Sequence, residues 1–181
     1  IGSNTVWRGF LAVLAALVVD ISGRDCSFFG AGGSARGSVY GLNQVGGRIV
    51  VRARRMDQAQ RMATDLGDVF VLDFRPIEEL GEVASQVDAP LIVNKTPLCM
   101  SPNVEGSVWP DGVPIPAGSF VYDLVYNPVE TRLMRQATAA GCRTSNGLGM
   151  LLRQGATSFA LWTELEPDLA IMKEVLEAAK E

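Results

Sequence analysis

The sequence feature that most constrains the fold is a glycine cluster, Gly30-Ala31-Gly32-Gly33, which directly follows the apolar run Cys26-Ser27-Phe28-Phe29. Residues 34–45 continue with a helical pattern. This order of strand, glycine turn and helix is typical of the first unit of a dinucleotide-binding domain. Gly30 permits the sharp turn, and Gly32 lets the backbone approach a pyrophosphate without an intervening Cβ. Because the N–H groups at the helix start face the phosphates, we predict a nucleotide site here.

Ala35 stands where a third glycine is common in such loops, and its small side chain lets the helix pack closely against the strand. Ligands of parallel sheets bind beyond the carboxyl ends of the strands, and Asn94-Lys95-Thr96 ends another apolar run. The predicted cofactor contacts of these two segments are Gly30, Ala31, Gly32, Gly33, Ser34, Ala35, Asn94 and Thr96.

The strand after the first helix, residues 48–52, indicates which dinucleotide binds. Many NAD-binding domains have an acidic residue at the end of this strand, where it accepts a hydrogen bond from the ribose 2′-hydroxyl. Here the strand end reads Arg52-Ala53-Arg54-Arg55, and the first acid is Asp57. Because arginine pairs well with a 2′-phosphate, we predict NADP rather than NAD as the cofactor. The alternative interpretation is a solvated basic turn.

Composition excludes several other classes of protein. The 181 residues, 48% of them hydrophobic, suit one compact α/β domain, and the net charge of −4 argues against a broad nucleic-acid-binding surface. No apolar run reaches the roughly 18 residues of a membrane span, and no signal-peptide pattern opens the chain. The absence of histidine excludes histidine-based triads and histidine-ligated metals, so we expect no metal site. Three widely spaced cysteines indicate reduced thiols in a cytoplasmic protein.

Further strands and helices alternate along the chain. We predict strands at residues 69–72, 91–94, 120–124 and 143–145, and helices at residues 56–66, 131–140, from 147 onward and 167–180. A short helical stretch is expected to begin at Pro76. The alternation predicts an α/β fold of the Rossmann type, a doubly wound parallel six-stranded sheet with helices on both faces.

Trp109 lies in a proline-rich segment, residues 97–118, with little periodicity. Loops of this length inside compact domains are typically functional or mobile. We expect Trp109 to anchor the segment, and stacking of its indole on a ligand is the alternative.

Four motifs give the chain a resemblance to a known family. They occupy residues 30–36, 94–100, 121–128 and 147–156, and the last, Gly147-Leu148-Gly149-Met150-Leu151-Leu152 followed by Gln154-Gly155-Ala156, is the most specific. Together they resemble the C-terminal cofactor domain of shikimate dehydrogenases, and the likeness covers nearly the whole chain. The resemblance implies an NADPH-dependent reduction of 3-dehydroshikimate to shikimate, a step of aromatic amino acid biosynthesis.

The resemblance also implies roles for individual residues. Arg54, with Arg55 beside it, is similar to the arginine that holds the 2′-phosphate. Gly147 and Met150 resemble the residues that flank the nicotinamide, and Tyr126 and Gln154 resemble substrate contacts. Asp123, in the motif of the fifth strand, is expected to be structural.

Departures from the family pattern affect catalysis most. The family pairs a lysine of its N-terminal substrate domain, which this chain lacks, with an aspartate in an Asn-Thr-Asp-x-x-Gly-Phe segment. This chain has Asn4-Thr5-Val6-Trp7-Arg8-Gly9-Phe10, and Val6 can neither relay a proton nor accept a hydrogen bond. We therefore predict no catalytic residue within the chain. Lys95 replaces a small residue, either adding charge near the phosphates or lying in solvent, and Cys99 replaces a glycine, which predicts a reshaped loop.

The missing lysine domain implies a division of the chain. Residues 1–19 are expected to form a connecting helix from an absent N-terminal substrate domain, and residues 20–181 the NADP-binding domain. Two hypotheses follow: the chain is the cofactor part of a dehydrogenase acting on shikimate or quinate, or it is a catalytically silent NADP-binding or regulatory module. In both, we expect binding of NADPH, negligible turnover alone, and no nucleic-acid or membrane partner.

Truncation has a structural consequence. We expect the apolar face of the first helix, with Phe10, Val13, Leu14 and Leu17, to face solvent along with half of the active-site cleft. Such a surface favours self-association, which leads to the hypothesis of a homodimer.

Overall fold

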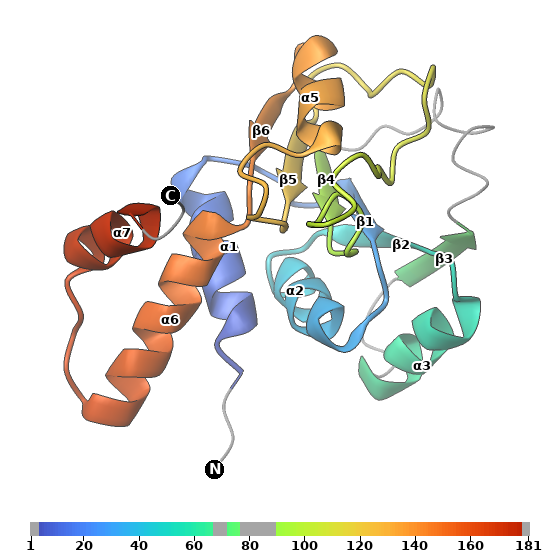
Figure 1. Cartoon of the computed structure of the whole chain (residues 1–181). Helices are drawn as coiled ribbons and strands as arrows, with labels where there is room; N and C mark the ends of the chain where they lie inside the picture. The colour runs from blue at the N-terminus through green and yellow to red at the C-terminus, as the bar shows by residue number, and fades with distance from the viewer. Residues whose placement is uncertain (1–3, 67–71, 77–89, 179–181) are drawn as a thin grey trace.

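A computed structural model describes residues 4–66, 72–76 and 90–178 of the chain (Figure 1). Strands and helices alternate through most of it, as the apolar runs and glycine turns of the sequence predict. The elements are α1 (Val6–Ala16), β1 (Asp25–Phe29), α2 (Gly33–Gln44), β2 (Arg48–Ala53), α3 (Met56–Leu66), β3 (Leu72–Pro76), β4 (Leu91–Asn94), β5 (Phe120–Asp123), α5 (Arg132–Ala139), β6 (Arg143–Ser145), α6 (Leu148–Thr163) and α7 (Leu169–Ala178).

The strands form one sheet in the order β3-β2-β1-β4-β5-β6, and every neighbouring pair is parallel. The strand order therefore reverses between β1 and β4, which makes the carboxyl ends of these two strands the topological switch point of the sheet. The α/β class and the parallel sheet predicted from the sequence are confirmed. No helix in the described part of the chain is both long and apolar enough to cross a membrane.

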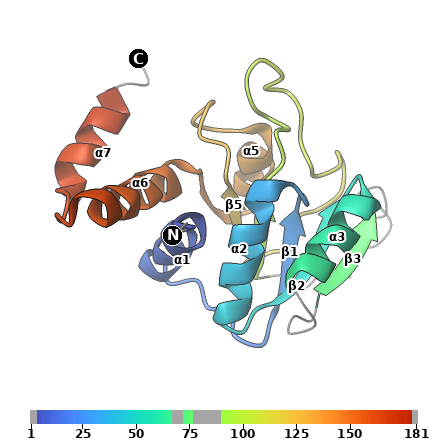
Figure 2. The same cartoon turned by 90° about the horizontal axis from the view of Figure 1, so that it is seen from below.

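Both faces of the sheet carry a hydrophobic core, because successive side chains of a strand point to opposite faces. On one face, Phe28 and Val93 pack in a cluster with residues of α1, α2 and α6. On the other face, Phe29, Ile92 and Val121 pack in a second cluster, which includes residues of α5 and the segment before β5. Figure 2 shows α2 and α3 side by side on the first face. The sheet is thus covered on both sides, as a buried parallel sheet requires.

The third strand lies later than predicted. The apolar residues 69–72 predict a strand there, but β3 runs Leu72–Pro76, and residues 69–71 lie outside the described residues. Backbone pairing decides the bounds, since Leu72 pairs with Ile49 and the register continues to the pair of Pro76 with Ala53. An edge strand does not need a continuous apolar run. Pro76 ends this strand, and the helical stretch expected after it lies outside the described residues.

The first helix is buried, which contradicts the prediction that its apolar face meets solvent. Phe10, Val13 and Leu14 are at most 6% exposed because α1 lies between α2 and α6. Gly9 makes the close contact with α6, since a Cβ on it would lie 2.9 Å from the backbone nitrogen of Gln154. Large exposed apolar side chains are instead concentrated from the end of α6 to α7, which has no buried residue. Figure 1 shows α1, α6 and α7 gathered to one side of the sheet.

Candidate cofactor site

The loops that follow β1, β2 and β4 meet at the carboxyl edge of the sheet. The backbone N–H of Gly30 donates to the carbonyl of Arg52 over 2.9 Å, and the N–H of Lys95 donates to the carbonyl of Phe29 over 2.8 Å. These bonds extend the strand pairing by one residue and fix the loops against each other. The site therefore rests on backbone that the sheet holds rigidly.

A cavity of about 320 Å³, which we call the arginine cavity, lies over this edge. Gly30 forms its floor with φ of +112°, and a Cβ placed there would lie 3.1 Å from the carbonyl oxygen of Lys95. A Cβ placed on Gly32, by contrast, would meet no protein atom within 4 Å. The lining residues are Gly30, Ala31, Gly32, Arg52, Ala53, Arg54, Arg55, Gln58, Lys95, Thr96, Pro97 and Leu98.

The start of α2 has no side-chain cap that would compete with a ligand for its backbone N–H groups. Its N-cap is Gly32, and no side chain caps the helix. Ser34 lies in the first turn, while Ala35 is fully buried beneath the helix and allows the close packing predicted for it. The open space at Gly32 and the uncapped N–H groups fit a diphosphate.

The arginines at the end of β2 divide into one buried and two exposed side chains. Arg52 is 5% exposed, whereas Arg54 and Arg55 lie at the surface and line the cavity. Neither Arg54 nor Arg55 forms an ion pair with a residue in the described part of the chain. Among the described residues, no aspartate or glutamate lines the cavity. The donors present therefore fit a 2′-phosphate rather than the hydroxyl of NAD.

A second cavity of about 490 Å³, which we call the tyrosine cavity, adjoins the first and shares Lys95, Thr96 and Pro97 with it. Tyr126, predicted to contact substrate, lines this cavity and is 48% exposed. The other lining residues are Met100, Ser101, Leu124, Val125 and Asn127. Because the two cavities share these three residues, we call them together the trench, which runs from the glycine loop to the loop after β5.

A hydrogen-bonded cluster beneath the trench holds its loops in place. The carboxylate of Asp123 accepts from Asn94 Nδ2 over 3.0 Å, from Thr131 Oγ1 over 2.6 Å and from the backbone N–H of Val125 over 3.1 Å. Burial raises the pKa of Asp123, and the three hydrogen bonds oppose that rise. The structural role predicted for Asp123 agrees with these contacts, but the sequence offered no signal that Thr131 joins it.

Asn94 and Thr96 have different places in the site. Asn94 is fully buried and lines neither cavity, and its Oδ1 accepts from both the backbone N–H and the Oγ1 of Thr96. Thr96 lines both cavities. Of these two predicted cofactor contacts, only Thr96 has direct access to a ligand in the trench, and Asn94 positions it.

The predicted nicotinamide and substrate contacts of α6 lie behind the trench. Gly147, the N-cap of α6, lies directly against the backbone after β5, since a Cβ on it would collide with the carbonyl oxygen of Leu124. Met150 is 4% exposed in the core under α1. Gln154 is half-buried where α6 contacts Gly9, and it does not line the tyrosine cavity.

Val6 begins α1 beside α2. Its Cγ1 lies 3.5 Å from the position of a Cβ on Gly37, and the side chain packs against the core. The backbone N–H of Val6 donates to Asn4 Oδ1 over 2.9 Å. Val6 thus takes part in packing at the position where the family has its aspartate.

The loop after β4 keeps the backbone form that a glycine would favour. Cys99 has φ of +72° and is fully buried, with its Sγ donating to the carbonyl of Gly106. Trp109 is 2% exposed, and its Nε1 donates to the carbonyl of Val113 over 2.9 Å. Trp109 therefore anchors the loop, as expected, and is too buried to stack on a ligand.

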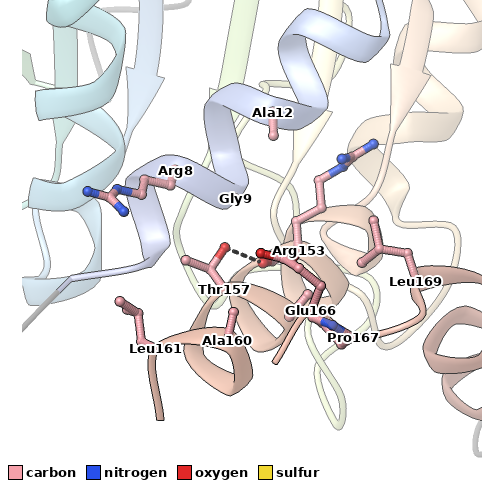
Figure 3. Close-up of a pocket in the computed structure, with 11 residues that line it drawn as sticks. Arg8, Gly9, Ala12, Arg153, Thr157, Ala160, Leu161, Glu166, Pro167 and Leu169 are labelled. Carbon is pink, nitrogen blue, oxygen red and sulfur yellow. Dashed lines mark hydrogen bonds between the residues drawn. The ribbon is translucent and has the colours of Figure 1, made fainter. Parts of the chain in front are cut away.

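A further cavity of about 440 Å³ lies among α1, α6 and the segment before α7 (Figure 3). Small residues, Gly9, Ala12 and Ala160, form part of its wall. Figure 3 shows the guanidinium groups of Arg8 and Arg153 directed to opposite sides, so its charges do not converge on one point. This cavity lies away from the glycine loop, and we place no cofactor in it.

Fold and trench together define a Rossmann-type dinucleotide-binding domain. Comparison with known proteins gives the family. Residues 147–177 match the model of the shikimate 5′-dehydrogenase C-terminal domain. The shikimate dehydrogenase (NADP(+)) of Salinibacter ruber is 40% identical over 182 residues, which are 98% of this chain and 64% of that protein. The chain belongs to the shikimate dehydrogenase family.

Solved structures agree with this assignment. Shikimate 5-dehydrogenase from Thermus thermophilus, in complex with NADP(H) and shikimate, is 34% identical with a TM-score of 0.82, over 98% of this chain and 63% of that one. Quinate dehydrogenase from Corynebacterium glutamicum, in complex with NAD, is 27% identical with a TM-score of 0.87, over 98% and 63%. The chain therefore spans less than two thirds of the length of these relatives.

Proposed function

We propose that this chain is the NADP(H)-binding part of an enzyme that reduces 3-dehydroshikimate to shikimate. The observation that carries the proposal is that Arg54 and Arg55 line the same cavity as the glycine loop, and that no acidic side chain is found there in the part of the chain that the structure describes. The Thermus thermophilus relative, in complex with NADP(H) and shikimate, supports it. The Corynebacterium glutamicum relative keeps quinate open as the substrate.

Each part of the trench has one task in this proposal. The N-terminus of α2 and the loop of Gly30 to Ala35 bind the diphosphate, and Arg54, with Arg55 beside it, binds the 2′-phosphate. Thr96 contacts the cofactor directly, and Asn94 holds Thr96 in place. When bound, NADPH supplies a hydride to the ketone carbon of the substrate.

The nicotinamide end and the substrate are assigned to α6 and the loop after β5. Gly147 allows the start of α6 to lie against the backbone of Leu124 beside the nicotinamide. Met150, which is buried, packs beneath the nicotinamide. Tyr126 and Gln154 contact the substrate. At the position matched to the aspartate of the family, Val6 carries no group that could relay a proton. Protonation of the product therefore depends on a substrate domain that residues 1–19 connect to this one.

The exposed apolar surface of α6 and α7 supports a second domain. Trp162 is 83% exposed, and Leu165, Ile171 and Val175 are each at least 59% exposed. Apolar side chains gathered in this way mark a surface that another protein body covers. We assign the substrate domain of the complete protein to this surface, and a second copy of the chain is the alternative occupant.

A catalytically silent NADP-binding or regulatory module is the second candidate function. It is favoured by Val6, whose side chain packs against Gly37 of α2 in place of a carboxylate. Activity of the complete protein separates the two candidates. Turnover of shikimate that rises in the Val6→Asp variant supports the dehydrogenase, whereas no turnover in either form, with NADP⁺ binding intact, supports the silent module.

Calorimetric titration with NADP⁺ and NAD⁺ tests the cofactor assignment. We expect NADP⁺ to bind more tightly, and Arg54→Ala to weaken NADP⁺ roughly 30-fold, about 2 kcal/mol, with little change for NAD⁺. Arg48→Ala is the matched control, because Arg48 lies at the opposite end of β2 and pairs with Asp25 over 2.6 Å. Equal losses for NADP⁺ and NAD⁺ in the Arg54 variant, or no NADP⁺ binding by the unmodified chain, would refute the assignment.

A further inference from the structure

Lys95 occupies the boundary between the arginine cavity and the tyrosine cavity. It directly follows β4, at the switch point of the sheet, and lines both cavities. Its backbone N–H donates to Phe29, and its carbonyl oxygen lies 3.1 Å from the position of a Cβ on Gly30. The backbone of Lys95 is thus fixed against the glycine loop, and its side chain starts from a rigid position.

Lys95 is half-buried, and no counter-ion for its ammonium group lies among the described residues. The ammonium forms no hydrogen bond or ion pair with a residue in the described part of the chain, and burial lowers the pKa of the group below 10.5. The charged side chains that line the two cavities with it are Arg52, Arg54 and Arg55, and the other titratable one is Tyr126. A partly desolvated cation among other cations is unfavourable unless an anion binds beside it.

We infer that Lys95 binds the diphosphate of the dinucleotide, at the point where the cofactor passes from one cavity to the other. The inference rests on the proposed function, which assigns the 2′-phosphate to Arg54 and Arg55 in the arginine cavity. A dinucleotide that continues into the tyrosine cavity must cross the boundary at Lys95, and the glycine loop directs the diphosphate to the same place. Because NAD and NADP share the diphosphate, Lys95 contributes to affinity and Arg54 to the choice between them.

Titration of the Lys95→Met variant with three ligands tests this assignment. NADP⁺ and NAD⁺ are each expected to bind about tenfold more weakly, since a charge-assisted contact to phosphate is lost from both. Adenosine 2′-monophosphate, which carries no diphosphate, is expected to bind as it does to the unmodified chain. Lys95→Arg restores most of the affinity, and Arg54→Ala gives the opposite pattern, with NADP⁺ weakened and NAD⁺ unchanged.

Proton uptake provides a second readout. Binding a phosphate next to Lys95 raises the pKa of its ammonium, so at alkaline pH the unmodified chain takes up protons when NADP⁺ binds. Affinity is highest below the lowered pKa of free Lys95 and falls as the pH rises through it. Calorimetry in buffers of different ionisation enthalpy measures the uptake, which is expected to disappear in Lys95→Met.

The outcomes separate this inference from the proposed function. No binding of NADP⁺ by the unmodified chain overturns both. Binding by the unmodified chain with affinities within about twofold in Lys95→Met overturns only the role of Lys95. A loss confined to NADP⁺ and adenosine 2′-monophosphate moves Lys95 to the 2′-phosphate and also overturns it. If Lys95→Met does not fold, as judged by thermal unfolding, Lys95→Gln takes its place with the same expectations.

Discussion

The trench at the carboxyl edge of the sheet differs sharply from the helical side formed by α1, α6 and α7. In the trench, the buried polar groups of Asn94 and Asp123 are hydrogen-bonded to each other. By contrast, Arg54, Arg55 and Lys95 form no ion pair with any residue that the structure describes. On the helical side, α1 packs closely against α6, but α7 exposes apolar side chains to solvent. The trench therefore lacks only an anionic ligand, whereas the outer surface of α7 lacks a protein surface to cover it.

The largest effect on stability is expected from Asp123→Asn, because the carboxylate of Asp123 accepts the three hydrogen bonds of the cluster beneath the trench. The amide would turn an N–H group towards at least one of three donors, so we expect a loss of about 3 kcal/mol in the free energy of unfolding. Asp111→Asn is the matched control, because Asp111 is 73% exposed in its ion pair with Arg132. Its cost should stay below about 1 kcal/mol. Equal costs in denaturant unfolding would show that the cluster does not hold the loops.

The second largest effect on stability is expected at Cys99, in the loop after β4, where the backbone has a positive φ. Cys99→Gly should be about 1 kcal/mol more stable than Cys99→Ala, because both lose the sulfur and only glycine accepts φ of +72° freely. At Cys142, which is buried but has no positive φ, the order should reverse. Thermal unfolding of the four variants measures both differences. The same order at both positions would refute backbone strain at Cys99.

The pH dependence of stability tests the uncompensated charge of Lys95. Because burial lowers the pKa of Lys95 in the folded chain, the folded state is penalised at neutral pH, where the lysine is charged in both states. Lys95→Met is therefore expected to gain about 1 kcal/mol or less at neutral pH. The gain should shrink as the pH rises through the lowered pKa towards 10.5, since the unmodified chain then loses its penalty. A gain that is constant with pH would contradict the lowered pKa.

The helical side is expected to respond least in stability and most in association. Ile171→Glu and Val175→Glu replace side chains that are 59% and 64% exposed, so the free energy of unfolding should change by no more than about 0.5 kcal/mol. Light scattering at tens of micromolar should show less self-association than in the unmodified chain, and Glu174→Ala is the control on the same helix. A monomeric mass for the unmodified chain would remove the homodimer and leave the substrate domain as the occupant.

Local patterns were sufficient for much of this protein. The glycine loop and α2 appear where the sequence predicts them, and the bounds of α3 and β4 agree with the prediction. Thr131, the first residue of the helix predicted at residues 131–140, caps α5, with its Oγ1 accepting from the N–H of Met134. These features depend on turn geometry, helix capping and side-chain alternation, which act between residues close in sequence.

Only the tertiary structure decided the features that depend on distant partners. The bounds of β3 follow from its pairing with β2, and the burial of Phe10 follows from the docking of α1 between α2 and α6. Likewise, Asp123 meets Thr131 and Lys95 reaches both cavities because the parallel sheet brings the ends of separate strands to one edge. Thus the sequence by itself determined the dinucleotide-binding unit. Packing determined which of its polar side chains are bound internally and which are left facing a ligand.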